Sequence, residues 1–112
     1  MGSHEMTPEL LDLVAERFRV LSEPTRLQLM NVLRDGERTV SELVEATGLG
    51  QANASKHLQL LKTHGFVERR KEGLFVYYRI ADPGVFKLCD LMCDHLERHS
   101  SARRELFAAG TP

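Results

Sequence analysis

The sequence predicts a mainly α-helical domain with a small β hairpin, in which four helices precede the hairpin and one follows it. Two short amphipathic segments flank a glycine-containing turn at residues 48–50, which is typical of two helices that meet at a steep angle. Two β-rich stretches are separated by a second turn at residues 72–74. A chain of 112 residues is long enough for one domain, which we expect to span residues 7–99.

A capping hydroxyl and two prolines at first helical positions predict where the first two helices begin. Thr7 offers a hydroxyl cap directly before Pro8, and this helix should run to about Leu21. Its apolar face is broad enough to pack against more than its own small domain and comprises Leu10, Leu11, Val14, Phe18 and Leu21. Pro24 then restarts the chain as a second helix that should end near Arg34.

Residues 39–65 have the pattern of a helix-turn-helix. Thr39 and Glu42 have the spacing of a capping box, which fixes the start of the third helix. In the fourth helix we expect Ala54, Leu58 and Leu61 to be core. The outward positions carry amides, a hydroxyl and amines, which bond base edges and phosphates, and they are Gln51, Asn53, Ser55, Lys56, Gln59 and Lys62. This helix can therefore lie in the DNA major groove.

A basic hairpin follows, with strands expected at residues 66–71 and 75–80. In the second strand Val76, Tyr78 and Ile80 alternate with Phe75, Tyr77 and Arg79, so one face can pack on the helices. Arg69, Arg70 and Lys71 could reach the DNA backbone or minor groove beside the fourth helix. The order of elements predicts a winged helix-turn-helix.

Asp82 and Pro83 should cap a last helix that runs from about Gly84 to His99. One stripe of this helix is apolar and contains Val85, Leu88, Cys89, Met92, Cys93 and Leu96. One small domain has little to bury both this stripe and the face of the first helix, so we expect a homodimer and a roughly palindromic operator. Residues 1–6 should be a disordered or vector-derived N-terminus, and residues 100–112 a C-terminal tail.

The formal net charge of −1 hides an uneven distribution. Residues 51–79 hold six lysines and arginines against two glutamates, a net +4 in an otherwise acidic chain. Such a segment is typical of a phosphate-binding face, although an ordinary solvated surface can have the same composition. No apolar run approaches the roughly 20 residues of a membrane span. We therefore expect no membrane partner and a cytoplasmic location.

Taken together, these segments resemble the ArsR/SmtB family of winged-helix repressors. The similarity covers about Leu10 to His99 and depends on the order and spacing of three motifs. They are Leu21-Ser22-Glu23-Pro24-Thr25-Arg26-Leu27, then Ser55-Lys56-His57-Leu58 followed by Leu61 and Gly65, then Arg70-Lys71-Glu72-Gly73 with Tyr77-Tyr78. The resemblance implies a homodimer built through the first and last helices that binds double-stranded DNA and represses transcription by occupying an operator. It also implies release by a small inducer that changes the geometry of the dimer.

The candidate DNA-binding residues are Thr39, Ser41, Gln51, Asn53, Ser55, Lys56, His57, Lys62, Arg69, Arg70 and Lys71. Two nearby roles stay open: Arg26 can pair with an acid or contact a phosphate, and His57 can contact DNA or be a buried, hydrogen-bonded histidine. Gly50 stands where the family usually has a serine cap, so the start of the fourth helix should be looser.

Many members of that family bind metals, and this sequence departs from their patterns. A thiolate site on the third helix would need cysteines between about Arg38 and Ala46, where there are none. A site on the last helix would use the positions of Asp82, Gly84, His95 and Arg98, two of which carry no ligand. We therefore expect no zinc site of this last-helix design, because tetrahedral zinc needs three or four protein ligands from two equivalent copies.

Cys89 and Cys93 are the candidate inducer-sensing residues, spaced one helical turn apart. They can bind a soft metal or metalloid ion together with ligands from a second chain, be oxidised by peroxide or reactive sulfur, or serve as small hydrophobic residues. The residues alone leave these three interpretations open.

Two other functional classes compete with DNA binding. A winged helix can serve as a protein-interaction module without DNA. A thiol enzyme lacks support, because Cys89 and Cys93 do not have C-x-x-C spacing and have no cationic residue at i±4 to lower a thiol pKa. We therefore expect that the protein is not an enzyme.

Overall fold

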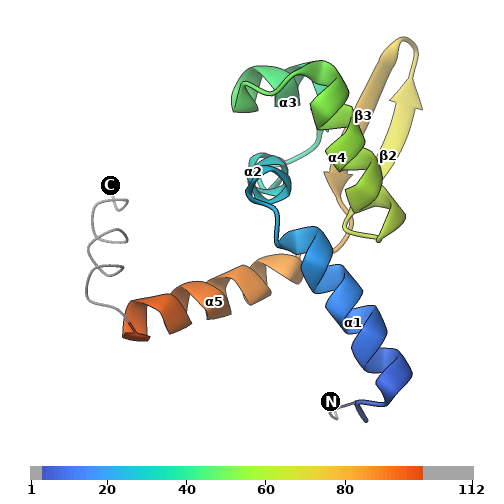
Figure 1. Cartoon of the computed structure of the whole chain (residues 1–112). Coiled ribbons are helices and arrows are strands. Elements are labelled where there is room, and N and C mark those ends of the chain that lie inside the picture. The colour runs from blue at the N-terminus through green and yellow to red at the C-terminus, as the bar shows by residue number, and fades with distance from the viewer. Residues whose placement is uncertain (1–3, 100–112) are drawn as a thin grey trace. The chain divides into compact units, whose positions relative to one another are not determined.

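The computed structural model describes residues 4–99, and within them five helices and three short strands follow one another (Figure 1). The helices are α1 (Pro8–Leu21), α2 (Pro24–Leu33), α3 (Val40–Thr47), α4 (Gln51–Thr63) and α5 (Val85–His99). The strands are β1 (Arg38–Thr39), β2 (Val67–Glu72) and β3 (Phe75–Ile80). The predicted helix order and hairpin are confirmed, and the expected start of the last helix shifts by one residue, to Val85.

Side-chain caps fix the starts of α1 and α3, whereas α4 begins without one. The Thr7 hydroxyl accepts a hydrogen bond from Leu10 N at 3.2 Å. At α3 the capping box is complete, because Thr39 Oγ1 accepts from Glu42 N at 3.1 Å and Glu42 Oε1 accepts from Thr39 N at 2.8 Å. Gly50 starts α4 without a side-chain cap.

The core lies among α2, α3, α4 and the sheet. Its fully buried side chains are Leu29, Met30, Leu33, Leu43, Leu58, Leu61 and Val67. Ala54, Leu58 and Leu61 are all 0% exposed, which confirms their predicted core role and fixes the rotation of α4. The opposite side of α4 is therefore presented to solvent.

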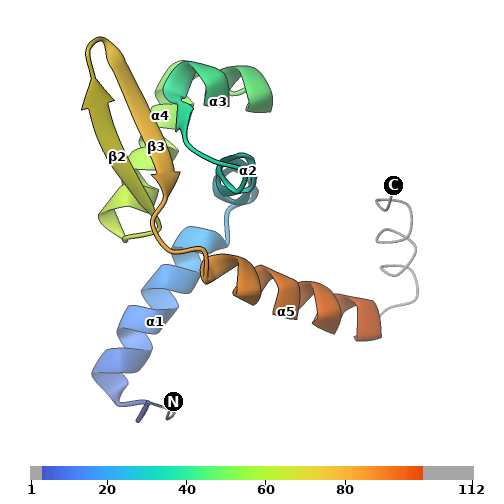
Figure 2. The same cartoon turned by 180° about the vertical axis from the view of Figure 1, so that it is seen from behind.

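The sheet has three antiparallel strands in the order β1-β3-β2. We refer to the hairpin of β2 and β3 as the wing; its two-residue turn contains Gly73, whose φ of +59° lies in the left-handed region that favours glycine. The sequence did not predict β1, which pairs Arg38 with Tyr78 and Thr39 with Tyr77. This short strand attaches the start of α3 to the wing, and Figure 2 shows it from behind.

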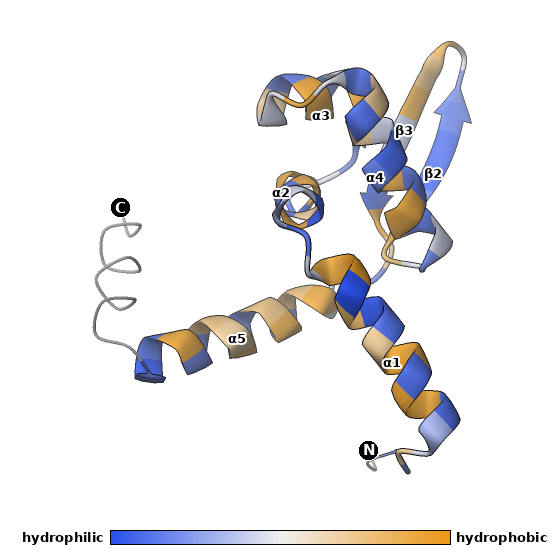
Figure 3. Ribbon diagram, in the orientation of Figure 1, coloured by the Kyte–Doolittle hydropathy of each residue, from blue (hydrophilic) through white to orange (hydrophobic). Residues whose placement is uncertain are grey.

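The chain divides into two compact units, residues 1–81 and 82–112. In the first, α1 leaves Leu11, Leu13 and Phe18 about half exposed. In the second, Asp82 Oδ1 accepts a hydrogen bond from Gly84 N at 2.8 Å just before α5, and α5 itself exposes Leu88, Leu91 and Met92. Figure 3 shows apolar bands along both helices.

The expected N-terminal segment and the C-terminal tail lie partly or wholly outside the described residues, so the proposed domain boundaries stay a prediction. None of the described helices is long and apolar enough to cross a membrane.

Candidate nucleic-acid interface

The solvent side of α4 carries a row of polar side chains. Gln51, Asn53, Lys56, Gln59 and Lys62 are exposed, as the sequence predicted, and Ser55 is half-buried. Lys56 lies opposite the buried positions of the helix at helical spacing and forms the crest of this ridge. The ridge therefore presents hydrogen-bonding groups outward from a rigidly packed helix.

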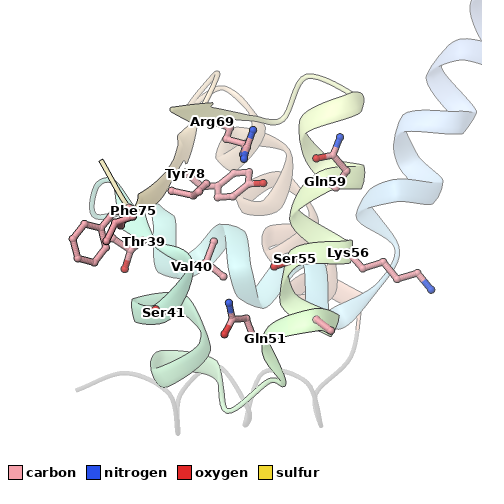
Figure 4. A pocket seen from close by; sticks show the side chains of 13 residues that line it. Thr39, Val40, Ser41, Gln51, Ser55, Lys56, Gln59, Arg69, Phe75 and Tyr78 are labelled. Atoms are coloured by element: carbon pink, nitrogen blue, oxygen red, sulfur yellow. The ribbon is translucent and has the colours of Figure 1, made fainter. Parts of the chain in front are cut away.

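A groove runs between α4, the start of α3 and the wing (Figure 4). Gln51, Ser55 and Gln59 line its α4 side, while Arg69 and Tyr78 line its wing side. Thr39, Val40 and Ser41 close the α3 end, and Leu74 and Phe75 stand at the tip of the wing. In the close-up Lys56 extends away from the other labelled side chains. Three elements thus shape one groove that is lined by both polar and apolar side chains.

The wing has two faces with different charge. Successive strand residues alternate, and directly paired residues share a face. The inner face, towards the helices, contains Val67, Arg69, Lys71, Val76, Tyr78 and Ile80. The outer face contains Glu68, Arg70, Glu72, Phe75, Tyr77 and Arg79. Every charged residue of the inner face is a cation, whereas the outer face balances two arginines with two glutamates.

Arg70 lies on the outer face, where acidic neighbours hold it. Its Nε and Nη2 donate to the two carboxylate oxygens of Glu37 at 2.8 and 2.7 Å, and its Nη1 is 3.5 Å from Glu72 Oε2. Its guanidinium carbon lies 4.3 Å from the centre of the Tyr77 ring. The hydrogen bonds from Arg70 hold the pKa of Glu37 below its usual value. Arg69, Arg70 and Lys71 are adjacent in sequence but do not share a face. Arg69 and Lys71 lie on the inner face, whereas Arg70 lies on the outer face and is bound to carboxylates.

Arg69 and Tyr78 are paired on the inner face of the wing, and both line the groove. Burial raises the pKa of Tyr78, and the neighbouring Arg69 opposes this rise. On the outer face, Arg79 Nη2 donates to Glu68 Oε2 at 2.6 Å. The cations that remain directed to the groove side are Arg69 and, one pair nearer the tip, Lys71.

Arg26 and His57 contact each other, which neither of the open interpretations of Arg26 anticipated. Arg26 Nε donates to the carbonyl oxygen of Val20 at 2.6 Å, and Arg26 Nη1 is 3.1 Å from His57 Nδ1. Both side chains are half-buried. Arg26 thus joins the end of α1 and the start of α2 to the middle of α4.

A second polar link joins α1 to the end of α4. His64 Nδ1 donates to the Leu60 carbonyl and His64 Nε2 to Glu16 Oε1, both at 3.0 Å. Because a carbonyl and an ionised carboxylate can only accept, both ring nitrogens carry protons in this arrangement. The Leu60 carbonyl and then the Glu16 carboxylate raise the pKa of His64.

The remaining candidate residues lie outside these networks or take part in caps. Thr39 is half-buried and its hydroxyl accepts the α3 cap bond, while Ser41 is exposed on α3. On α5 both cysteines are free thiols, with Cys89 half-buried and Cys93 exposed. Within residues 4–99 no three histidine, cysteine or acidic side chains gather into a group that could hold a metal ion.

Sequence reasoning missed several residues of this region. Glu37 precedes β1 in a loop that carries no motif, and its partner Arg70 is 33 residues away. Glu16 and His64 are 48 residues apart. No local spacing indicates such pairs, so only the fold reveals them.

Comparisons with known proteins agree with this geometry. Residues 23–69 match the profile of a family described as bacterial regulatory proteins, arsR family. An HTH-type transcriptional regulator of Mycobacterium tuberculosis is 42% identical over 91 residues, which cover 81% of this chain and 40% of that protein. A probable mercury resistance operon repressor of Streptomyces lividans is 42% identical over 77 residues, which cover 69% of this chain and 62% of that protein. The chain therefore spans about half the length of these relatives.

A solved structure is also similar. The homodimeric winged helix-turn-helix DNA-binding domain from Mycobacterium bovis, determined by solution NMR, superposes with a TM-score of 0.73 and 41% identity. The match covers 88% of this chain and 94% of that one. The likeness thus extends over the helices and the wing together.

Proposed function

We propose that this chain, which belongs to the arsR family of bacterial regulatory proteins, represses transcription by binding duplex DNA as a homodimer. The observation that supports this function is the exposed polar ridge of α4 beside the cationic inner face of the wing. Amides and amines on a helix that fits the major groove match the donor and acceptor pattern of base edges. Cations beside such a helix match the phosphates that border it.

Roles follow from position on α4 and the wing. Gln51, Asn53 and Lys56 are exposed and near the start of α4, so they would read bases, with Ser55 beside them. Lys62, Arg69 and Lys71 would contact phosphates and give general affinity. Thr39 and Ser41 at the α3 end of the groove would lie near the same backbone. Arg70 would mainly hold the wing in place and would not contact a phosphate, because its charge is already paired with the carboxylates of Glu37 and Glu72.

The dimer would form through α1 and α5. Phe18 is 53% exposed on α1, and Leu91 and Met92 are 65% and 57% exposed on α5. Large apolar side chains grouped on a helix face are typical of a protein–protein interface. Twofold pairing would place two copies of α4 about one DNA turn apart, so the operator would be roughly palindromic.

Selection from a pool of random duplexes tests the function. We expect enrichment of palindromic sequences, and we expect Asn53→Ala to lower affinity for the enriched duplex much more than affinity for random DNA. Lys71→Gln is the matched control, because loss of a phosphate contact should weaken both duplexes equally. Absence of any enrichment would favour a protein-interaction module instead.

We also propose that the inducer acts on the thiols of Cys89 and Cys93. They are free, at least partly accessible and one turn apart on α5, within the helix that would form the dimer. A soft ion bound there would need further ligands from a second chain, since the described residues of one chain supply no third ligand nearby. Oxidation would more easily link two chains than two residues of one helix.

Titration of the DNA complex separates these inducers. Arsenite, cadmium, zinc, peroxide and persulfide are added in turn to wild type, Cys89→Ser and Cys93→Ser. Release by a thiol-specific agent that both substitutions abolish supports thiol sensing, and the agent identifies its chemistry. Release that survives both substitutions would refute it.

A further inference from the structure

A second hollow flanks α4 on the side away from the wing. It has a volume of about 350 Å³ and is lined by Arg26, Lys56, His57, Gln59, Leu60 and Thr63. Water in the liquid takes about 30 Å³ per molecule, so this hollow has room for a phosphate group. Lys56 and Gln59 line both this hollow and the wing-side groove, so the α4 ridge separates the two.

Arg26 brings a positive charge to this hollow, and no carboxylate within residues 4–99 forms an ion pair with it. Its two hydrogen-bond acceptors, the Val20 carbonyl and His57 Nδ1, are neutral groups. Glu23 is the acid nearby: hydrogen bonding to Thr25 and then electrostatic interactions with Arg26 and His57 lower its pKa. Its carboxylate accepts from Thr25 N and makes no ion pair with Arg26 among the described residues. The Arg26 guanidinium is therefore oriented through Nε and Nη1 by a carbonyl and an imidazole.

The same contact determines where His57 carries its proton. A guanidinium can only donate, so His57 Nδ1 must accept from Arg26 and has no proton. The proton of a neutral imidazole then lies on Nε2, which becomes a donor. Thr63 adds no donor, because its hydroxyl already donates to the Gln59 carbonyl at 2.9 Å. The hollow thus combines one oriented guanidinium, one imidazole N–H and the exposed amine of Lys56.

We propose that this hollow binds a backbone phosphate of duplex DNA, on the strand opposite the one that the wing contacts. The inference depends on the proposed DNA-binding function and adds a second backbone site to it. The major groove is about 12 Å wide, and a helix with its side chains is about 10–12 Å in diameter, so an inserted helix has a backbone close on each side. The wing-side cations meet one backbone, and Arg26 and His57 meet the other.

Salt dependence of DNA binding distinguishes a phosphate contact from a purely structural arginine. Each neutralised phosphate contributes about 0.9 to the slope of log affinity against log salt. We expect Arg26→Gln to reduce the slope by about that amount, with the protein still folded and dimeric. Arg17→Gln removes the same charge from the exposed side of α1 and should leave the slope unchanged. An unchanged slope for Arg26→Gln would overturn the inference.

Neutral backbone substitutions identify the phosphate itself. Single methylphosphonates are placed along each strand of the enriched duplex. One of them, on the strand away from the wing, should weaken wild-type binding roughly tenfold to hundredfold and leave Arg26→Gln binding unaffected. If every methylphosphonate weakens the two proteins equally, Arg26 contacts no phosphate.

A measurement on the wild-type protein covers the case in which Arg26→Gln does not fold. Nitrogen-15 NMR of the imidazole should show His57 protonated at Nε2, and this signal should shift when the enriched duplex is added. A shift with inorganic phosphate alone and none with duplex would identify a free-anion site and refute the backbone contact. If wild type binds no duplex at all, the proposed function fails; if it binds duplex normally and the slope test is negative, only this second site fails.

Discussion

The charged residues of the wing occupy two environments that alternate along β2. Arg69 and Lys71 share the inner face with buried Tyr78, while Arg70 faces outward to Glu37 and Glu72. A cation already paired with carboxylates releases few counterions when DNA binds, because its charge is compensated beforehand. We therefore expect adjacent arginines and lysines of one strand to contribute differently to the proposed DNA affinity.

Substitution of single wing cations should separate these contributions. Lys71→Gln should reduce the salt slope of DNA binding by about 0.9, the value for one phosphate contact. Arg70→Gln should leave the slope nearly unchanged and lower affinity through a less firmly held wing. Fluorescence anisotropy titrations at several salt concentrations measure both quantities, and Glu37→Gln should reproduce the Arg70→Gln result. Equal loss of slope in Arg70→Gln and Lys71→Gln would show that Arg70 leaves Glu37 to contact DNA.

At this scale the sequence indicated the kinds of residue but not their pairing. The exposed polar positions of α4 follow from helical spacing around Ala54, Leu58 and Leu61. The contact between Arg26 and His57 spans 31 residues and joins two helices, so it depends on tertiary packing. A histidine in a recognition helix looks the same in sequence whether it faces a base or an arginine.

Among the elements, α1 and α4 are joined by a hydrogen bond whose strength depends on pH. The His64 side chain is 13% exposed and contacts both Leu60 and Glu16. The pKa of His64 is raised from 6.5, so its contribution to stability is complete below that value and is lost as pH rises through the folded-state pKa. The pKa of Glu16 is lowered from 4.5 by His64, so its contribution is present above that value and is lost as pH falls through the folded-state pKa.

The link should therefore be strongest in mildly acidic solution, between these two ordinary pKa values. We expect His64→Gln to reduce the free energy of unfolding more at about pH 5.5, within this window, than above the raised pKa of His64. Urea unfolding at a series of pH values measures the difference. Glu16→Gln is the paired control. It should remove the part of the pH dependence of stability that comes from the Glu16 carboxylate and leave the part that comes from the hydrogen bond between His64 and the Leu60 carbonyl. A His64→Gln effect that is constant across this range would show that the histidine stays neutral.

The start of α3 gives a second prediction at this scale. Thr39→Ala removes the hydroxyl that accepts from Glu42 N and should cost about 1 kcal/mol of stability. Ser41→Ala, on the exposed side of the same helix, is the matched control and should have little effect. Thermal unfolding compares the two. A similar loss in both variants would mean that the cap is not the source of the stability.

Local signals predicted most elements but not the third strand. Proline starts, the capping box and β-rich alternation all act within a few residues, and each placed its element to within about two residues. Strand β1 has only two residues, too few for any periodicity, and it exists because Arg38 and Thr39 pair with β3. Pairing of distant segments is the part of this fold that local patterns do not contain.

For the whole molecule, the unburied apolar surface of α1 and α5 is the main unexplained feature of one isolated chain. Leu11, Leu13 and Phe18 on α1 and Leu88, Leu91 and Met92 on α5 are each at least 45% exposed. Burial of apolar surface contributes about 25 cal/mol per Å², so a second copy that covers such faces would stabilise both chains. The sequence indicated this surface through its amphipathic stripes, while the arrangement of two chains in the proposed dimer depends on contacts that one chain does not define.

A charge placed on the apolar stripe of α5 should therefore separate the two chains. Met92→Asp should shift the dimer towards monomer at micromolar concentration, because burying an unpaired carboxylate is unfavourable. Asp94→Lys, on the opposite side of the same helix, changes charge without touching the stripe and should remain dimeric. Sedimentation equilibrium measures assembly, and binding to full and half operators measures its consequence.

A monomer presents only one α4, so Met92→Asp should lose the advantage of bivalent binding, about 10²- to 10⁴-fold on the full operator. Its affinity for a half operator should match that of the wild type, because the α4 ridge and the wing are intact. A Met92→Asp protein that stays dimeric would place the interface elsewhere. Equal losses of affinity for full and half operators would mean instead that the substitution damages the DNA-binding unit. The half-operator measurement therefore distinguishes dissociation of the dimer from misfolding of the chain.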